Sequence, residues 1–126
     1  MKIAIADDSG LLRERVKSAL SGIKNVEVVG EATNGIDALQ MIIDKDPDYM
    51  ILDLRMPGLN GISVLMKSRE YESKCKICIL TNYAYTPYKE RCFSEGAHYF
   101  FDKNLDFGRM VKIISDLANR GVALII

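Results

Sequence analysis

The 126-residue sequence lacks several features that would direct it to a particular class of protein. It has no excess charge of either sign, because 17 Lys and Arg residues balance 17 Asp and Glu residues, so it gives no support for general attraction to nucleic acid or to a membrane surface. It has no apolar run near the roughly 20 residues that a membrane span requires. Its cysteines number only three, and two acids soon follow the N-terminus, which is not typical of a signal peptide. We therefore expect a single cytoplasmic domain.

The sequence contains two patterns that alternate. A short apolar run is followed by a segment with apolar residues at helical spacing, and this pair occurs five times. This order predicts an α/β fold, a (βα)5 doubly wound parallel sheet of five strands with helices on both faces. The flavodoxin-like strand order for such a sheet is 2-1-3-4-5. The runs that predict strands are residues 3–6, 26–29, 49–52, 77–80 and 98–101.

The expected domain covers residues 1–121, with Gly121 ending the last helix. Residues 122–126 are all apolar, and we expect them to form a tail or the start of a linker. Polar residues predict where each helix begins. These helix starts are Asp8 or Ser9, the segment Thr33-Asn34-Gly35, Asn60, Thr86 followed by Pro87 at the first helical position, and Asp106.

Polar side chains follow four of the five predicted strands. Asp53 follows the third, Asp7 and Asp8 follow the first, Thr81 the fourth and Lys103 the fifth. The carboxyl ends of parallel strands meet at one edge of the sheet, where such folds bind ligands. Three carboxylates gathered there repel one another unless a cation lies among them.

This set of side chains suits phosphoryl chemistry. Carboxylate oxygens favour a hard cation, Mg²⁺ or Ca²⁺, and Mg²⁺ is usually bound by one or two carboxylates together with a phosphate oxygen. A lysine and a hydroxyl beside the metal can stabilise a transferring phosphoryl group. Asp53 can then act as the nucleophile and form an aspartyl phosphate.

From about Lys2 to Arg120 the sequence resembles a response-regulator receiver domain of bacterial two-component signalling, of the chemotaxis-regulator-like kind. Each motif alone is weak, but their order and their places at the strand ends together are specific. The motifs are Asp7-Asp8, Asp53-Leu54-Arg55-Met56-Pro57 with Gly61, Leu80-Thr81, and Gly96-Ala97 followed by Phe100 and Lys103.

The resemblance implies that Asp53 accepts a phosphoryl group from a histidine kinase or a phosphotransfer protein. It implies one cofactor, Mg²⁺, with Asp8 as a direct ligand, Asp7 acting through water, and Asp53 and the backbone carbonyl of Arg55 completing the protein ligands. The domain would catalyse only its own phosphorylation and dephosphorylation, so it is not expected to be an enzyme acting on outside substrates.

The resemblance also implies a switch. Lys103 would pair with a phosphoryl oxygen, Thr81 would move to hydrogen-bond the phosphoryl group, and Phe100 would turn inward into the space that Thr81 leaves. This change would alter a surface formed by the fourth helix, fifth strand and fifth helix, where a downstream protein binds. A homodimer is possible on this basis, whereas direct DNA binding and membrane binding are not expected.

Two residues depart from the family pattern. Asn104 stands where many members have proline after the lysine, and Asp102 occupies a position that is commonly apolar and can divert Lys103. They are the only support for an alternative function, a receiver-like interaction module that works without phosphorylation. A hydrolase of the haloacid dehalogenase type is disfavoured, because Arg55 stands where its second aspartate would be.

Two further features lie outside the strand-end set. Cys75 and Cys78 form a CxxC pair that enters a strand without a second pair, so we expect Cys78 in the core and Cys75 near the surface. Arg55 and Tyr83 follow Asp53 and Thr81 at the same distance of two residues, which suggests that they shield an acyl phosphate from water.

Overall fold

Five parallel strands form one sheet in the order β2-β1-β3-β4-β5, which confirms the predicted fold class. The structure is a computed structural model that describes the backbone of residues 1–125 and the side chains of residues 1–120. Its elements in chain order are β1 (Lys2–Ala6), α1 (Gly10–Ser21), β2 (Glu27–Ala32), α2 (Gly35–Lys45), β3 (Tyr49–Leu52), α3 (Gly61–Glu70), β4 (Lys76–Thr81), α4 (Thr86–Ser94), β5 (Tyr99–Asp102) and α5 (Phe107–Ile125).

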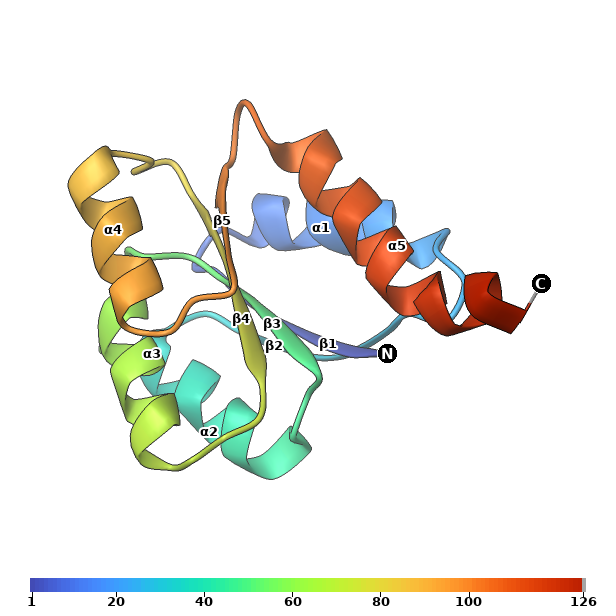
Figure 1. The fold of residues 1–126 in the computed structure, drawn as a ribbon. Helices are drawn as coiled ribbons and strands as arrows, with labels where there is room; N and C mark the ends of the chain where they lie inside the picture. The colour runs from blue at the N-terminus through green and yellow to red at the C-terminus, as the bar shows by residue number, and fades with distance from the viewer. Residues whose placement is uncertain (126) are drawn as a thin grey trace.

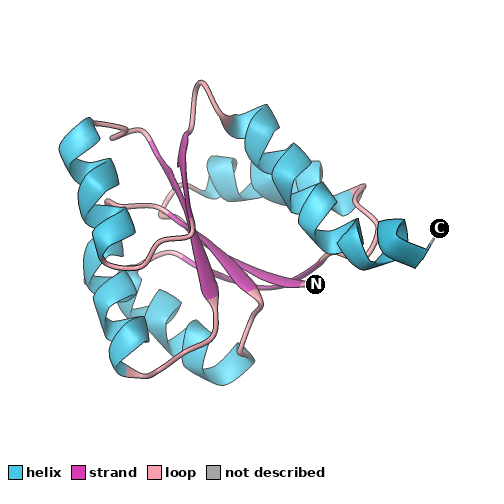
Figure 2. Cartoon of the chain, viewed as in Figure 1, coloured by secondary structure: helices cyan, strands magenta, loops and turns pink. Residues whose placement is uncertain are grey.

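Helices cover both faces of the sheet, so the molecule has three layers. Helices α1 and α5 lie on one face, and α2, α3 and α4 lie on the other (Figure 1). Figure 2 shows the strands, in magenta, lying between these two helical layers. Successive strand side chains point to opposite faces and fill two separate cores: Ile3 and Ile5 join the α1/α5 side, whereas Ala4 and Ala6 join the other.

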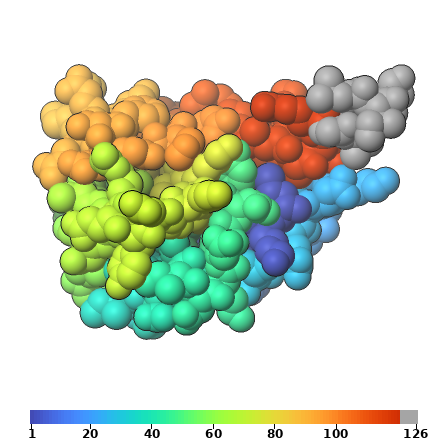
Figure 3. Space-filling view, turned by 60° about the horizontal axis from the view of Figure 1, so that its bottom comes forward, coloured from blue at the N-terminus to red at the C-terminus, as the bar shows by residue number. Residues whose placement is uncertain are grey.

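Every residue of β3 is buried, which explains why this strand is an unbroken apolar run in the sequence. The carboxyl end of this strand is therefore held rigidly between two layers. In the space-filling view of Figure 3, the N-terminal residues, in dark blue, lie at the surface between the green segments and the red α5. Among the described residues, no helix is long and apolar enough to cross a membrane.

Three predicted helix starts are confirmed by side-chain hydrogen bonds. Ser9 Oγ accepts the Leu12 N–H at 3.2 Å, as an N-cap does. The same geometry recurs at α2 and α3, where Asn34 and Asn60 accept the N–H groups of the residues three positions on.

The other two helix starts differ from the prediction. Helix α4 already includes Thr86, so Tyr85 is the N-cap residue, and it makes no side-chain cap hydrogen bond. Asp106 does precede α5, but its carboxylate accepts the N–H of Asp102 at 2.9 Å, and so closes the loop before the helix.

Two elements are longer than the sequence predicts. Strand β2 continues through residues 30–32 instead of ending at Val29, because these residues still pair with β1 beyond a register shift. Helix α5 continues past Gly121 to Ile125, so the prediction that Gly121 ends it is wrong. A glycine inside a helix costs only about 1 kcal/mol, which the helix-forming residues around it can offset. Ile126 and the side chains of the predicted tail lie outside the described residues.

The CxxC pair belongs to the core. Cys78 is buried as expected, but Cys75 is also buried, at 7% exposure, which corrects its predicted place near the surface. Burial raises the pKa of both thiols to about 12, so both remain protonated near neutral pH. This favours a packing role for the pair over redox or zinc chemistry.

Candidate functional site

Asp53 lies directly after β3, and two donors hold its carboxylate. The Asp53 N–H donates to the carbonyl of Ala6, so β1 and β3 stay paired up to this residue. Oδ1 accepts the Leu54 N–H at 2.7 Å, and Oδ2 accepts a hydrogen bond from Lys103 Nζ at 3.0 Å. The residue is only 6% exposed, so the carboxylate is held within the fold.

The two acids after β1 have different environments. Asp7 is buried; its Oδ2 lies 2.8 Å from Lys103 Nζ, and its Oδ1 accepts the Ser9 N–H at 2.8 Å. Asp8 is exposed. Each of Asp7, Asp8 and Asp53 offers a carboxylate oxygen, and these oxygens all lie within 4.8 Å of one another.

Lys103 reaches this acidic cluster from the end of β5, the strand at one edge of the sheet. It follows β5, its N–H donates to the Thr81 carbonyl, and its ammonium contacts both Asp7 and Asp53. Burial by itself would lower the pKa of Lys103, but the hydrogen bonds and charges of the two carboxylates outweigh this effect and leave that pKa raised.

The departures at Asp102 and Asn104 do not divert this lysine. The Asp102 carboxylate accepts the N–H groups of Asn104 at 2.7 Å and Leu105 at 3.1 Å, so it is occupied by the loop that follows β5. All described peptide bonds are trans, including the bond between Lys103 and Asn104.

Thr81 and Phe100, the two residues predicted to form a switch, are both buried. Thr81 is fully buried at the end of β4, and its Oγ1 accepts the Tyr83 N–H at 3.0 Å. Phe100 is 6% exposed and packs in the core, with its ring centroid 6.5 Å from that of Phe93. The Thr81 hydroxyl is thus engaged with its own loop, and its predicted movement stays a prediction.

Arg55 and Tyr83, which follow Asp53 and Thr81 by two residues each, lie in contact with one another. The Arg55 guanidinium carbon is 4.0 Å from the centre of the Tyr83 ring, which is within the range of a cation–π interaction. These residues, together with Leu54, Asn60 and Tyr88, line a cavity of about 190 Å³.

Two glycines shape the loop between Asp53 and α3. Gly58 adopts a φ of 80°, a backbone conformation that residues with a Cβ rarely adopt. At Gly61 an added Cβ would collide with the backbone of Asp53 and Leu54, and its N–H donates to the Leu54 carbonyl at 2.8 Å. The start of α3 can therefore approach the Asp53 backbone only because residue 61 is glycine.

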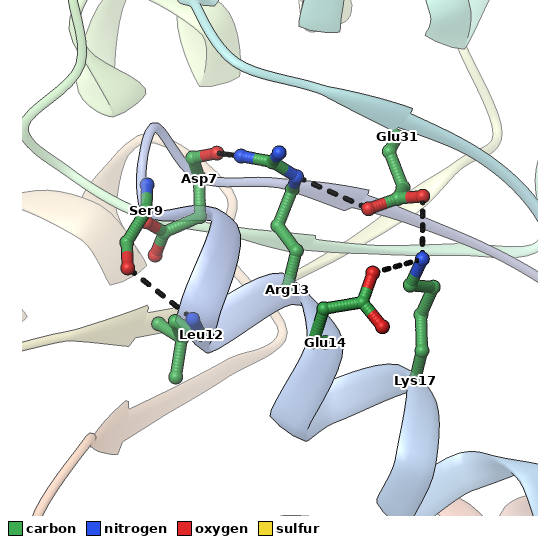
Figure 4. Close-up of polar contacts among 7 residues, drawn as sticks. All are labelled: Asp7, Ser9, Leu12, Arg13, Glu14, Lys17 and Glu31. Carbon is green, nitrogen blue, oxygen red and sulfur yellow. Dashed lines mark hydrogen bonds and ion pairs between the residues drawn. The ribbon is translucent and has the colours of Figure 1, made fainter.

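One polar network at the site is absent from the sequence predictions. Arg13 donates to the Asp7 carbonyl at 2.7 Å and to Glu31 at 3.1 Å, and Lys17 contacts both Glu31 and Glu14 (Figure 4). The sequence assigned no chemistry to the end of β2. Its only local signal was an acid at Glu31, and two basic residues one helical turn apart on α1 supply the partners.

The acidic cluster can hold a metal ion. Its donors are carboxylate oxygens, which suit a hard divalent cation. The ammonium of Lys103 contacts two of the three carboxylates, so the cluster has negative charge to spare and a cation would relieve the repulsion.

The fold and the site together define a class, the flavodoxin-like α/β proteins with an acidic cluster and a lysine at the carboxyl edge of the sheet. Residues 3–115 match the response regulator receiver domain, and the chain belongs to this family, as the motifs predicted.

Known proteins of this family resemble the chain closely. It is 34% identical over 118 residues to the probable transcriptional regulatory protein NarL of Mycobacterium tuberculosis, covering 94% of this chain and 55% of that protein. It is 28% identical to the response regulator GacA of Pseudomonas aeruginosa, covering 90% of this chain and 53% of that protein. The chain thus spans about half the length of these relatives.

Solved structures show the same architecture. The signal receiver domain of the putative response regulator NarL from M. tuberculosis superposes with a TM-score of 0.86 at 34% identity, covering 94% of this chain and 95% of that one. A DNA-binding response regulator of the LuxR family from Staphylococcus aureus gives 0.85 at 26% identity, covering 94% and 98%.

These relatives correct one prediction. The sequence predicted no direct DNA binding, but the matched proteins are transcriptional regulatory proteins, and one matched structure is that of a DNA-binding response regulator. The prediction was wrong because the charge balance on which it depended describes only 126 residues, about half the length of such a regulator. The kinase partner, the surface of α4, β5 and α5, and the homodimer stay predictions.

Proposed function

We propose that this domain accepts a phosphoryl group on Asp53 from the phosphohistidine of a histidine kinase or phosphotransfer protein. A carboxylate oxygen of Asp53 attacks phosphorus as the phosphorus–nitrogen bond breaks, and the histidine nitrogen leaves with the electron pair. The products are an aspartyl phosphate and a free histidine. The observation that carries the proposal is the convergence of Asp53, Asp7 and Lys103 within 3.0 Å contacts at the carboxyl edge of the sheet.

The side chains around Asp53 suit this reaction. The Leu54 N–H and the Lys103 ammonium hold the Asp53 carboxylate in place, and that ammonium can remain paired with a phosphoryl oxygen as negative charge arrives. The Thr81 hydroxyl, at the end of the neighbouring strand, is the group that would hydrogen-bond the bound phosphoryl group, with Phe100 filling the space behind it.

Mg²⁺ is the cation that the cluster would hold. Asp8, Asp53 and the backbone carbonyl of Arg55 would be its protein ligands, with Asp7 acting through water. When bound, the ion would neutralise the carboxylates and the phosphoryl oxygens. The domain catalyses only its own phosphorylation and dephosphorylation. We also propose a cytoplasmic location, which is consistent with three free and buried thiols.

The test uses acetyl phosphate as the phosphoryl donor. We expect wild-type protein with Mg²⁺ to gain the mass of one phosphoryl group in intact-mass spectrometry, and Asp53→Asn to gain none. Asp44→Asn, the same change at an exposed position of α2, is the matched control and should be phosphorylated like wild type. Phosphorylation that survives Asp53→Asn would contradict the proposal.

The alternative of an interaction module without phosphorylation loses its support. It depended on Asp102 and Asn104 keeping Lys103 from the site, whereas Lys103 lies within hydrogen-bond distance of Asp53. The relatives are transcriptional regulators, so we infer that phosphorylation of Asp53 controls a transcriptional output.

The stacked pair of Arg55 and Tyr83 is expected to protect the aspartyl phosphate. The guanidinium and the ring lie in contact with one another. They belong to the loops that follow Asp53 and Thr81, and we expect them to obstruct the approach of a water molecule in line with the acyl phosphate. We predict faster loss of phosphate from the double variant Arg55→Asn/Tyr83→Ala. Release of inorganic phosphate after removal of the donor measures this rate, and Tyr71→Ala, at an exposed site on the end of α3, is the control. An equal or longer lifetime in the double variant would remove the idea.

A further inference from the structure

Arg13 makes two hydrogen bonds that phosphoryl transfer to Asp53 does not use directly. From α1, its Nη1 donates to the backbone carbonyl of Asp7 at 2.7 Å, and its Nε donates to Glu31 Oε1 at 3.1 Å. Figure 4 shows the guanidinium lying between these two partners, which come from the ends of β1 and β2. Its side chain is only 18% exposed, so this position is more confined than that of a surface arginine.

These contacts hold the backbone of Asp7 on both sides. Its N–H donates to the carbonyl of Ala32, the last residue of β2, at 3.0 Å, and its carbonyl accepts from Arg13. Glu31, which holds the guanidinium, directly precedes Ala32. The end of β2 therefore supports the Asp7 backbone directly through Ala32 and indirectly through Arg13.

The consequence reaches Asp8 through the peptide bond. The carbonyl of Asp7 and the backbone nitrogen and Cα of Asp8 belong to one rigid, planar peptide unit. The hydrogen bond from Arg13 therefore fixes the plane of this peptide unit, and with it the position of the Asp8 Cα from which the side chain extends. Asp8 is exposed, so core packing does not hold its carboxylate as it holds that of Asp7.

Arg13 is itself held firmly. Lys17 Nζ contacts Glu31 Oε2 at 3.0 Å, so Glu31 has a cation on each of its oxygens. The hydrogen bond from Lys17, together with that from Arg13, lowers the pKa of Glu31 and outweighs burial, which would raise it. Glu31 therefore stays ionised. Because Nη1 of Arg13 binds a carbonyl and not a carboxylate, it brings positive charge near the cluster without occupying an oxygen that a cation needs.

We propose that Arg13 is a positioning residue for the divalent-cation site, acting through the Asp7–Asp8 peptide unit and held in place by Glu31. This inference depends on the Mg²⁺ binding in the proposed function. Partners that orient metal ligands generally change metal affinity by about 10–100-fold when they are removed.

Calorimetric titration of the metal-free protein with Mg²⁺ tests the proposal. We expect the Kd to rise by about 10-fold in Arg13→Gln, and by less in Arg13→Lys, because one ammonium cannot donate to both partners with the fork of a guanidinium. Glu31→Gln should also raise the Kd. The control is Arg91→Gln, which removes an Arg Nε–Glu contact of similar length, 3.2 Å, on α4, and it should bind Mg²⁺ like wild type.

Phosphorylation by acetyl phosphate supplies a second readout. In Arg13→Gln the rate should fall at low Mg²⁺ and return to the wild-type rate at saturating Mg²⁺, because the reacting groups are intact. A purely structural role would instead lower the free energy of unfolding, measured in urea, and leave the Kd of the folded protein unchanged.

The outcomes separate this inference from the proposed function. If wild type binds Mg²⁺ and Arg13→Gln binds it with the same Kd, the role of Arg13 is overturned and the proposed function stands. If wild type does not bind Mg²⁺, both are overturned. If Arg13→Gln does not fold, Arg13→Lys and Glu31→Gln decide the question, and an unchanged Kd in both overturns the proposal.

Discussion

The carboxyl edge of the sheet contains two polar clusters that differ in burial. In the acidic site after β1, β3 and β5, the side chains of Lys103, Asp7 and Asp53 are 11%, 5% and 7% exposed. In the network at the end of β2, Glu31 and Lys17 are each 32% exposed. Water screens the charges of the second cluster far more than those of the first. The two charges of an ion pair therefore interact much more strongly in the site.

The two clusters also differ in charge balance. The site gathers three carboxylates, of which the ammonium of Lys103 contacts two, so it carries unrelieved repulsion. In the β2 network, Arg13 and Lys17 balance Glu31 and Glu14. A site proposed to bind a cation would keep spare negative charge at a cost in stability, whereas a cluster that supports the backbone can be neutral. The following predictions test this contrast, from the largest expected effect to the smallest.

Removing the ammonium from the buried site should have the largest effect on stability. In Lys103→Met, the carboxylates of Asp7 and Asp53 lose their shared partner, and we expect the free energy of unfolding at pH 7 to fall by about 3 kcal/mol. Urea denaturation without Mg²⁺ measures this change. Lys112→Met on α5 is the control; its pair with Asp116 is exposed and 3.7 Å long, so the loss should be about 0.5 kcal/mol or less. Equal losses in the two variants would show that the ion pairs of Lys103 contribute no more to stability than an exposed ion pair.

Removing one carboxylate should have the opposite sign. Asp8 is the exposed acid of the cluster, and Asp8→Asn relieves repulsion from Asp7 and Asp53. In the absence of divalent cations we expect it to raise the free energy of unfolding by about 1 kcal/mol, the size of a charge interaction near water. Adding Mg²⁺ should stabilise wild type but not this variant. Asp116→Asn, on the surface of α5, is the control, and a decrease in the stability of Asp8→Asn would argue against unrelieved repulsion in the site.

The pH dependence of stability should show the smallest effect. The pKa of Lys103 is raised in the folded protein, so its contribution to stability is fully present below its unfolded pKa of about 10.5 and is lost as pH rises through the folded pKa. The stability difference between wild type and Lys103→Met should therefore be constant from about pH 7 to 10 and decrease only above about pH 10.5. Urea denaturation of both proteins across this range measures it. A difference that already declines between pH 7 and 9 would contradict the raised pKa.

Much of this architecture could be predicted because its signals are local. Buried strands and amphipathic helices repeat their apolar residues with different periods, so their alternation in the sequence was sufficient for the fold class. The strand order came from the flavodoxin-like fold that this alternation indicates. The caps at Ser9, Asn34 and Asn60 were also predictable, since each bonds an N–H only three residues away. The cap expected at Thr86 failed by one residue, which is the precision such signals have at helix ends.

The site was predicted in part. The chain order placed Asp7, Asp8, Asp53 and Lys103 at strand ends, and the parallel sheet brings such ends to one edge. The sequence could not tell which neighbouring acid is buried, nor whether Lys103 turns to Asp53 or to Asp102. Those outcomes depend on the loop after β5, where backbone N–H groups occupy the Asp102 carboxylate.

By itself, then, the sequence determined the elements, their order and the residues available at the carboxyl edge of the sheet, because these follow from periodicity and from the direction of parallel strands. Only the tertiary structure decided the contacts between distant residues: the ammonium of Lys103 shared by two carboxylates, and Arg13 linking the ends of β1 and β2. Such contacts depend on packing and on competing hydrogen bonds across the fold, which no local pattern records.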